Sequence, residues 1–312
     1  MLYLALSKTN RLENLTKMKT KTMRKLLFST ILVLLVMLGC TRNSPIPTSF
    51  APPTFEVLSK HPKYDCINNE MGMFIEVFGM YVIATDSAPT NYVIHTANVL
   101  AQYIDNDEDG IPDDPAVLKY LVNENVVVPV WKETDTAFRS TRCGRKFNFA
   151  ASMYYDHDQW AIAGNLAGIE KTGKWDTNLE EVWHIVTKGW KETYPKAFGD
   201  QKPSLFTDAM DIARGGYFKE LPAQYPDKAW YRYYDQSCDY YCQAHEYIYW
   251  ALMANIGALD PKLTNKCERS SHEWHICTAS ELRHKDVLVS RLLNDMAFKL
   301  PTRIPDGSYL RD

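Results

Sequence analysis

The sequence predicts an α+β fold in which a half of mixed strands and helices packs on a mostly helical half. Before about residue 190 the chain has short runs rich in β-branched and aromatic residues, such as 74–85 and 126–131, which favour strands. After residue 190 the apolar residues recur mostly at helical spacing. Residues 55–312 are numerous enough for one globular domain, which we expect to have two lobes at about 55–190 and 191–312.

Local signals place the individual elements. Asp114 and Pro115 fit the N-cap and first residue of a helix, and Thr278 with Glu281 forms a capping box. Gly189 predicts a helix end. Pro129 predicts an edge strand or a strand end, because proline donates no ladder hydrogen bond. Together the signals predict strands at 74–85, 126–131, 146–155 and 160–163, and helices at 90–104, 115–121, 178–189, 204–214, 238–257 and 279–298.

Residues 1–39 are predicted to be a signal peptide rather than part of the fold. A short basic start at residues 23–25 precedes a thirteen-residue apolar run at 26–38, which is short for a bilayer span. Because residues 1–22 would put several polar residues ahead of the signal, we expect translation to start at Met18 or Met23.

The apolar run ends in Gly39-Cys40. This pair resembles the lipobox of bacterial lipoproteins, with Met37 where that family usually has leucine. The resemblance implies that Cys40 is lipidated and anchors the protein in the bacterial cell envelope, at the outer membrane or cell surface. The alternative is an uncleaved N-terminal anchor helix. Residues 40–54 carry four prolines among Ser and Thr, which indicates an extended tether.

The charge balance argues against nucleic acid as a partner. Removal of residues 1–39 takes away seven of the 35 basic residues and one of the 38 acidic residues, which leaves a net charge of −9. Phosphate binding needs a basic surface, and the sequence shows no compact cluster of Lys and Arg.

The cysteines indicate an oxidising compartment, because six remain when Cys40 is set aside and six is an even number. Cys267 and Cys277 bracket a nine-residue loop, and we expect them to pair with each other. The alternative for this loop is a zinc site that adds His272 and His275.

The other four cysteines allow several pairings. Cys238 and Cys242 lie one turn apart on a predicted helix, where the side chains are too distant for an easy mutual bond. We therefore expect each to pair elsewhere, with Cys66 and Cys143 as the available partners.

An acidic loop follows the helix at 90–104 and predicts a calcium site. Carboxylates at alternate positions direct hard oxygen ligands to one centre, and Gly110 permits the sharp turn around an ion. The loop resembles the DxDxDGxxD calcium loops of thrombospondin type 3 repeats more than a signalling EF-hand, because Ala116 stands where an EF-hand has its closing glutamate. The resemblance implies a structural site for Ca²⁺. The expected ligands are Asp105, Asp107, Asp109, the carbonyl of Ile111, and Asp113.

The helix predicted at 178–189 contains a candidate metal centre. Its apolar stripe predicts one buried flank, and Glu180 and His184 lie one turn apart beside that stripe. The pattern EExxH resembles the HExxH helix of zinc metallopeptidases with its first histidine replaced by glutamate. The resemblance implies that Glu181 is the catalytic general base. A Glu/His pair at this spacing is also common as a plain hydrogen bond, and that alternative stays open.

A working centre needs a third protein ligand. Glu246 is the best candidate, because gluzincin metallopeptidases complete their site with a glutamate from a later helix. This similarity implies a zincin-like fold and a Zn²⁺ ion, although two carboxylates and one imidazole suit manganese or iron better. Candidate donors to a developing oxyanion are His157, Tyr240, His245 and Tyr247.

Two functions remain. The first is a lipid-anchored, calcium-binding metallohydrolase, peptidase-like and of degenerate zincin type. The second is a non-catalytic surface protein in which the aromatic residues of 230–250 bind a peptide or a polysaccharide. The sequence lacks the GxSxG and GxGxxG motifs and the complete GxxxxGK[ST] phosphate loop, which argues against serine hydrolases of that type and against nucleotide chemistry.

Overall fold

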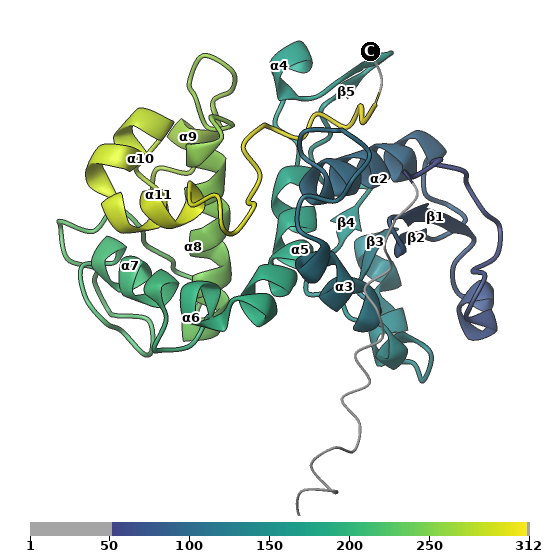
Figure 1. Cartoon of the computed structure of the whole chain (residues 1–312), viewed down its shortest axis with the longest axis horizontal. Helices are drawn as coiled ribbons and strands as arrows, with labels where there is room; N and C mark the ends of the chain where they lie inside the picture. Colours follow the sequence, from purple (N-terminus) through teal and green to yellow (C-terminus); the bar gives the residue numbers. More distant parts are fainter. Residues whose placement is uncertain (1–51, 311–312) are drawn as a thin grey trace, which may run out of the picture. The chain divides into compact units, whose positions relative to one another are not determined.

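The computed structural model describes residues 52–310. The predicted signal peptide, Cys40 and most of the predicted tether lie outside these residues. The described part has the predicted α+β organisation, with a sheet and its helices in one half and helices in the other (Figure 1). None of its helices combines the length and the apolar character that crossing a membrane requires.

A four-stranded sheet forms the first half. Strands β1 (Met73–Val77) and β2 (Met80–Ala84) are antiparallel, whereas β3 (Val127–Trp131) pairs parallel with β2 and with β4 (Met153–Tyr154). The predicted single strand at 74–85 was therefore wrong. Phe78 and Gly79, both with positive φ, turn the chain into a hairpin between β1 and β2.

Two predictions about strands also fail. Pro129 lies in β3, which has neighbours on both sides, so it does not mark an edge strand. Because β4 pairs only with Val130 and Trp131, the missing N–H of Pro129 breaks no ladder on that side. The predicted strand at 146–155 is reduced to β4, which leaves β4 as the sheet edge nearest the helical half.

Both faces of the sheet are buried, and successive residues of each strand serve different faces. On one face, Val77 and Val82 join a core with α2 (Thr90–Ile104) and α5 (Asn178–Thr193). On the other face, Phe74 and Tyr81 join a smaller core. The rest of this smaller core comes from β2, from β3 and from the chain regions around three 3₁₀ segments. These segments are η1 (Asp65–Asn69), η2 (Glu133–Ser140) and η3 (Gly144–Lys146).

Helix α5 is the long helix at the junction of the two halves (Figure 1). It contacts α2, α3 (Pro115–Asn123), α6 (Pro195–Phe198) and α8 (Tyr240–Asn255). Gly189 does not end the helix, as predicted, but lies buried inside it. A Cβ atom there would come within 2.6 Å of Val117 Cγ1 in α3, so glycine lets the two helices approach closely.

The second half consists mainly of helices packed around α8. Helix α7 (Leu205–Ala213) begins with a capping box at Ser204, and α8 is buried along most of its length. The helix predicted at 279–298 is instead two helices, α10 (Ala279–Lys285) and α11 (Val287–Leu293). Asp286 separates them and caps α11 with its side chain. The remaining short elements are β5 (Ile162–Ala163), β6 (Leu166–Ala167), α4 (Ile169–Thr172) and α9 (Lys266–Arg269).

Three disulfides connect the described cysteines. Cys267 pairs with Cys277 as predicted, and Cys66 pairs with Cys143. The expectation that Cys238 and Cys242 have other partners was wrong, because they bond to each other. Helix α8 begins only at Tyr240, so Cys238 precedes the helix and its Cα comes within 5.2 Å of that of Cys242. With three disulfides the protein belongs to an oxidising, extracytoplasmic compartment.

Candidate metal centre

The first turn of α5 is fixed by buried hydrogen bonds to α2. The Asp176 carboxylate lies 2.5 Å from His95 Nε2 and accepts the Asn178 backbone N–H at 3.0 Å. Thr96 donates to the Asn178 side chain at 2.7 Å, and Tyr103 donates to the Leu179 carbonyl at 2.7 Å. This network holds the start of the helix in place just before Glu180.

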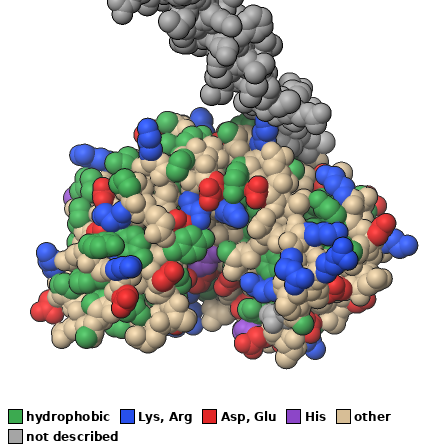
Figure 2. Space-filling view, turned by 90° about the horizontal axis from the view of Figure 1, so that it is seen from below, with side chains coloured by type: hydrophobic (Ala, Val, Ile, Leu, Met, Phe, Trp, Pro, Cys, Tyr) green, Lys and Arg blue, Asp and Glu red, His purple; other side chains and the backbone are tan. Residues whose placement is uncertain are grey.

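The predicted residues line one cavity of about 520 Å³ between the two halves. Helix α5 contributes Glu180, Glu181 and His184, and α8 contributes Glu246 and Trp250. Figure 2 shows that the described part is hollowed on the face it displays, with histidine and acidic side chains visible in the hollow. The remaining lining residues are Arg139, Ala150, Ala151, Ser152, Tyr154, Tyr233, Lys266, Ser270, His272 and Glu273.

The imidazole of His184 is poised to bind a cation. It is 8 % exposed, and its Nε2 has no hydrogen-bond partner among the described residues. This nitrogen lies 3.8 Å from Glu246 Oε2. Burial lowers the pKa of His184, and Glu180 and a hydrogen bond to the backbone of His245 oppose this shift. A neutral ring with one nitrogen held by the backbone and the other unpaired is the arrangement of a metal-binding histidine.

Glu246 and Glu181 are carboxyls that resist ionisation in the cation-free protein. Burial, followed by repulsion from Glu180 and Glu273, raises the pKa of Glu246 to about 8. Burial, followed by repulsion from Glu180, Asp158 and Glu246, raises the pKa of Glu181 to about 8. The contact of His184 with Glu246 is therefore not an ion pair at neutral pH. A bound cation would favour ionisation of both carboxyls.

Glu180 is placed differently from the other acidic residues. Its carboxylate lies 3.4 Å from Lys266 Nζ at the start of α9, and that ammonium also lies over the rings of Trp175 and Trp250. The charge of Glu180 is thus balanced by Lys266, whereas His184 Nε2 has no hydrogen-bond partner among the described residues. Of the three predicted metal ligands, His184 and Glu246 are in contact in the folded chain, and Glu180 lines the same cavity.

Sequence reasoning missed several residues of the cavity. Glu273 belongs to the His272–His275 stretch, which we considered only as a zinc loop, and burial raises the pKa of its carboxyl. Tyr233 lines the cavity, and its hydrogen bond to Glu246 lowers the pKa of that carboxyl. Burial raises the pKa of Tyr233 far above its usual range, so the phenol keeps its proton.

The predicted oxyanion donors do not line this cavity. Tyr240 donates to Asp211, and Tyr247 donates to Asp286. His245 faces Asp200 at 3.6 Å, and His157 is exposed beside Asp156. Within the described residues, Tyr233 and Tyr154 are the tyrosines that line the cavity. On α8, Tyr240, Tyr247 and Tyr249 are buried in the core, and Tyr241 is exposed outside the cavity.

The acidic loop has a compact fold of its own. One carboxylate oxygen each of Asp105, Asp107 and Asp109 lies within 4.8 Å of the other two. Asp105 is fully buried and accepts the Gly110 backbone N–H at 2.8 Å. Asp113 accepts the Asn106 backbone N–H at 2.7 Å, and burial raises its pKa to about 6. Ile111 lies in the same loop with an exposed side chain.

Residues 301–310, which we name the C-terminal strap, are bound to this loop. The Asn106 side chain accepts the backbone N–H groups of Thr302 and Arg303, each at 2.8 Å. Tyr309 donates to Asp105, and the Leu310 N–H donates to Glu108 at 2.7 Å. The strap runs from α11 back across the molecule to α2 (Figure 1).

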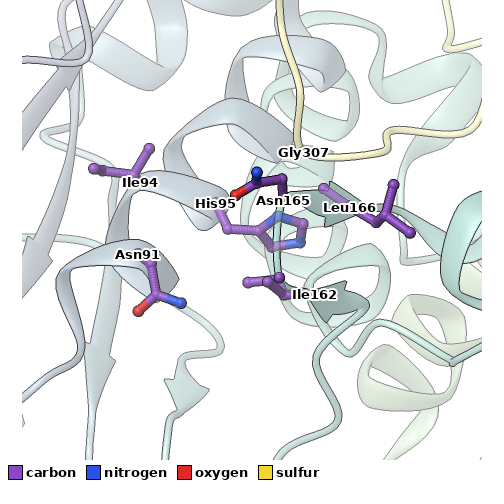
Figure 3. A pocket seen from close by; sticks show the side chains of 9 residues that line it. Asn91, Ile94, His95, Ile162, Asn165, Leu166 and Gly307 are labelled. Atoms are coloured by element: carbon purple, nitrogen blue, oxygen red, sulfur yellow. The ribbon is translucent and has the colours of Figure 1, made fainter.

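A second pocket, of about 380 Å³, lies beside α2. It shares no lining residue with the cavity of about 520 Å³ described above, which we name the Glu181 cavity. His95 and Asn91 from α2 face Ile162, Asn165 and Leu166 across it (Figure 3). The His95 ring is 3 % exposed and is held by Asp176, so this histidine belongs to the core.

Comparison of this chain with protein families, with curated proteins and with solved structures finds no match.

Proposed function

We propose that the protein is a divalent-cation-dependent hydrolase that cleaves an amide bond in a peptide-like substrate outside the cytoplasm. The observation that carries the proposal is the buried, unpaired Nε2 of His184, which faces the Glu246 carboxyl in a cavity with three further glutamates. Buried nitrogen atoms without partners are costly, and buried acidic groups repel each other. A cation removes both costs.

His184, Glu246 and Glu180 are the residues that would hold the ion. One nitrogen and two carboxylates form a hard donor set that fits Mn²⁺ or Fe²⁺ better than Zn²⁺. When bound, the ion would supply Lewis acidity toward a substrate carbonyl. Glu181 takes the proton of the attacking water. The protonated phenol of Tyr233 donates to Glu246 and so orients this ligand. The zincin-like character of the fold is part of this proposal.

Metal titration tests the site without relying on turnover. The full chain is stripped with chelator and titrated with Mn²⁺ and with Zn²⁺ by calorimetry, with calcium present. We expect one site that His184→Ala abolishes and that His284→Ala, an exposed histidine on α10, leaves unchanged. Equal binding by the His184→Ala variant would refute the assignment.

A second experiment tests the reaction. The loaded enzyme is incubated with a mixed peptide library, and new termini are read by mass spectrometry. Glu181→Gln should bind the ion normally but lose cleavage, because the amide cannot accept a proton. A protein that binds calcium alone and cleaves nothing would instead be a non-catalytic surface binding protein. Burial of Tyr247 and Tyr249 leaves these two α8 rings unable to form its binding surface.

We also propose that the acidic loop binds Ca²⁺ through Asp105, Asp107, Asp109, the Ile111 carbonyl and Asp113. The support is the convergence of three aspartates around a fully buried carboxylate in a loop that holds the C-terminal strap. Calcium at millimolar concentration should raise the melting temperature of the full chain. Asp107→Asn should reduce that rise, whereas Asp156→Asn, an exposed aspartate elsewhere, should not.

The proposed location is the bacterial cell envelope, with the protein held by lipid on Cys40. The disulfides support an extracytoplasmic domain. Metabolic labelling with an alkyne fatty acid should tag the wild-type chain and not Cys40→Ala. An uncleaved anchor helix predicts no label in either chain.

A further inference from the structure

The basic residues of the Glu181 cavity are not equivalent. Lys266 Nζ lies 3.4 Å from Glu180, and His272 Nε2 lies 3.3 Å from Glu273. Arg139, which lines the same cavity from η2, forms no ion pair with any described carboxylate. In a cavity with four glutamates, this guanidinium is the cationic group that has no anionic partner in the described chain.

The guanidinium of Arg139 is nevertheless held in position. Its central carbon lies 4.6 Å from the centre of the Phe149 ring, a distance at which a cation is attracted to an aromatic face. One of its nitrogens donates to the hydroxyl of Ser152 at 3.4 Å, and Ser152 is buried. A guanidinium has five N–H donors in a fixed planar fork, so most of them stay available here.

Within the described part, two backbone N–H groups close to Ser152 in the chain also lack a protein acceptor. Ala150 and Ala151 line the cavity next to Ser152. Among the described residues, no acceptor takes a hydrogen bond from the N–H of either alanine. A planar cation beside free backbone N–H groups matches a carboxylate, which accepts two parallel hydrogen bonds from arginine and further bonds from amides.

The glutamates of the cavity restrict where an anion fits. Glu181 and Glu246 face the cavity from α5 and α8, and a substrate carboxylate near them would meet either repulsion or competition for the bound cation. An anionic substrate group is therefore favoured only beside Arg139 and residues 150–152, which line the cavity without a carboxylate of their own.

We propose that Arg139 binds a carboxylate of the substrate, so that the enzyme acts on peptides with a negative charge close to the cleaved bond. This inference rests on the proposed function for the cleavage but concerns a different wall of the cavity. The carboxylate is either the C-terminal group of the peptide or an acidic side chain, and the arms of the test separate the two.

The test measures binding rather than turnover. The full chain with Glu181→Gln is titrated by calorimetry with three peptides up to millimolar concentration. They are N-acetyl-Ala-Ala-Ala with a free carboxylate, the same peptide with a C-terminal amide, and N-acetyl-Ala-Glu-Ala amide. Each titration is run in EDTA and again with Mn²⁺. The variants carry Arg139→Gln or, as a matched control, Arg142→Gln, an exposed arginine three residues on that does not line the cavity.

We expect at least one carboxylate peptide to bind about tenfold more tightly than the neutral amide, the effect of one charge-assisted pair at a partly exposed site. Arg139→Gln should remove this preference and Arg142→Gln should keep it. Preference for the first peptide identifies a terminal carboxylate, and preference for the third identifies an acidic side chain.

Equal binding of all three peptides, no binding of any, or a preference that survives Arg139→Gln would overturn the proposal. These outcomes leave the metal titration of His184→Ala untouched. Conversely, a carboxylate preference in a chain that binds no transition metal would support the Arg139 subsite and refute the hydrolase.

Discussion

Replacement of Glu246 by glutamine should stabilise the cation-free protein at alkaline pH and not at acidic pH. The pKa of Glu246 rises from 4.5 to about 8 on folding, chiefly because the carboxyl is buried. Between these two values the unfolded chain has lost the proton and the folded chain has kept it. The free energy of unfolding therefore falls as the pH rises through this window. Glutamine does not titrate, so the variant lacks this contribution.

The size of the effect follows from the shift. At about 1.4 kcal/mol per pH unit, a change from 4.5 to about 8 corresponds to about 5 kcal/mol at full weight. The side chain is 17 % exposed at the wall of an open cavity, so water weakens the interaction. We expect the difference between the unfolding free energies of the variant and the wild type to grow by about 2 kcal/mol from pH 5 to pH 8.

Urea unfolding of both chains in EDTA at pH 5, 6.5 and 8, followed by circular dichroism, measures this difference. Glu268→Gln on α9, an exposed glutamate outside the cavity, is the control for the loss of one carboxylate. Addition of Mn²⁺ at pH 8 should reverse the order, because the cation stabilises the wild type and loses a ligand in the variant. A difference that is the same at pH 5 and pH 8 would refute the raised pKa and with it the electrostatic picture of the cavity.

Three further outcomes follow from packing and cross-linking. Gly189→Ala should lower the unfolding free energy by about 1–3 kcal/mol in urea titration, because its Cβ would meet Val117 at 2.6 Å, whereas Lys188→Ala beside it should change little. Loss of the Cys66–Cys143 bond should cost about 4.5 kcal/mol and loss of the Cys238–Cys242 bond about 2 kcal/mol, since the sequence separations are 77 and 4 residues. Equal losses in the two double-serine variants would contradict this ranking. Tyr309→Phe should weaken calcium binding measured by calorimetry by less than Asp107→Asn does, because the phenol only orients Asp105.

The sequence predicted those parts of the fold that depend on local signals. The capped helix at Pro115 and the helix from Thr90 to Ile104 lie where they were expected, because cap residues and apolar spacing act within a few residues. The hairpin at Phe78-Gly79 was missed because the residues on both sides of Gly79 are rich in strand-forming types and were taken as one strand. Gly189 was misread because its role depends on α3, which lies far away in the sequence.

The same distinction applies to the candidate site. Glu180, Glu181 and His184 could be grouped from their helical spacing, and the similarity to gluzincins added Glu246, which does line their cavity. Lys266, Tyr233, Arg139 and Glu273 come from loops and short helices without a repeated pattern, so only the folded chain brings them to this wall. The disulfide between Cys238 and Cys242 was missed for a smaller reason, a helix start two residues later than expected.

The contact between the C-terminal strap and the acidic loop can form only late in synthesis. Residues 301–310 are the last described segment to leave a ribosome or an export channel, yet their hydrogen bonds to Asn106, Asp105 and Glu108 join them to a loop made some two hundred residues earlier. Until that segment arrives, the acidic loop lacks its tyrosine partner and its backbone donors, and its carboxylates face one another without them. Any nascent chain held short of this point would therefore expose the charged loop to solvent, to free calcium and to proteases of the compartment before the finished molecule could shield it.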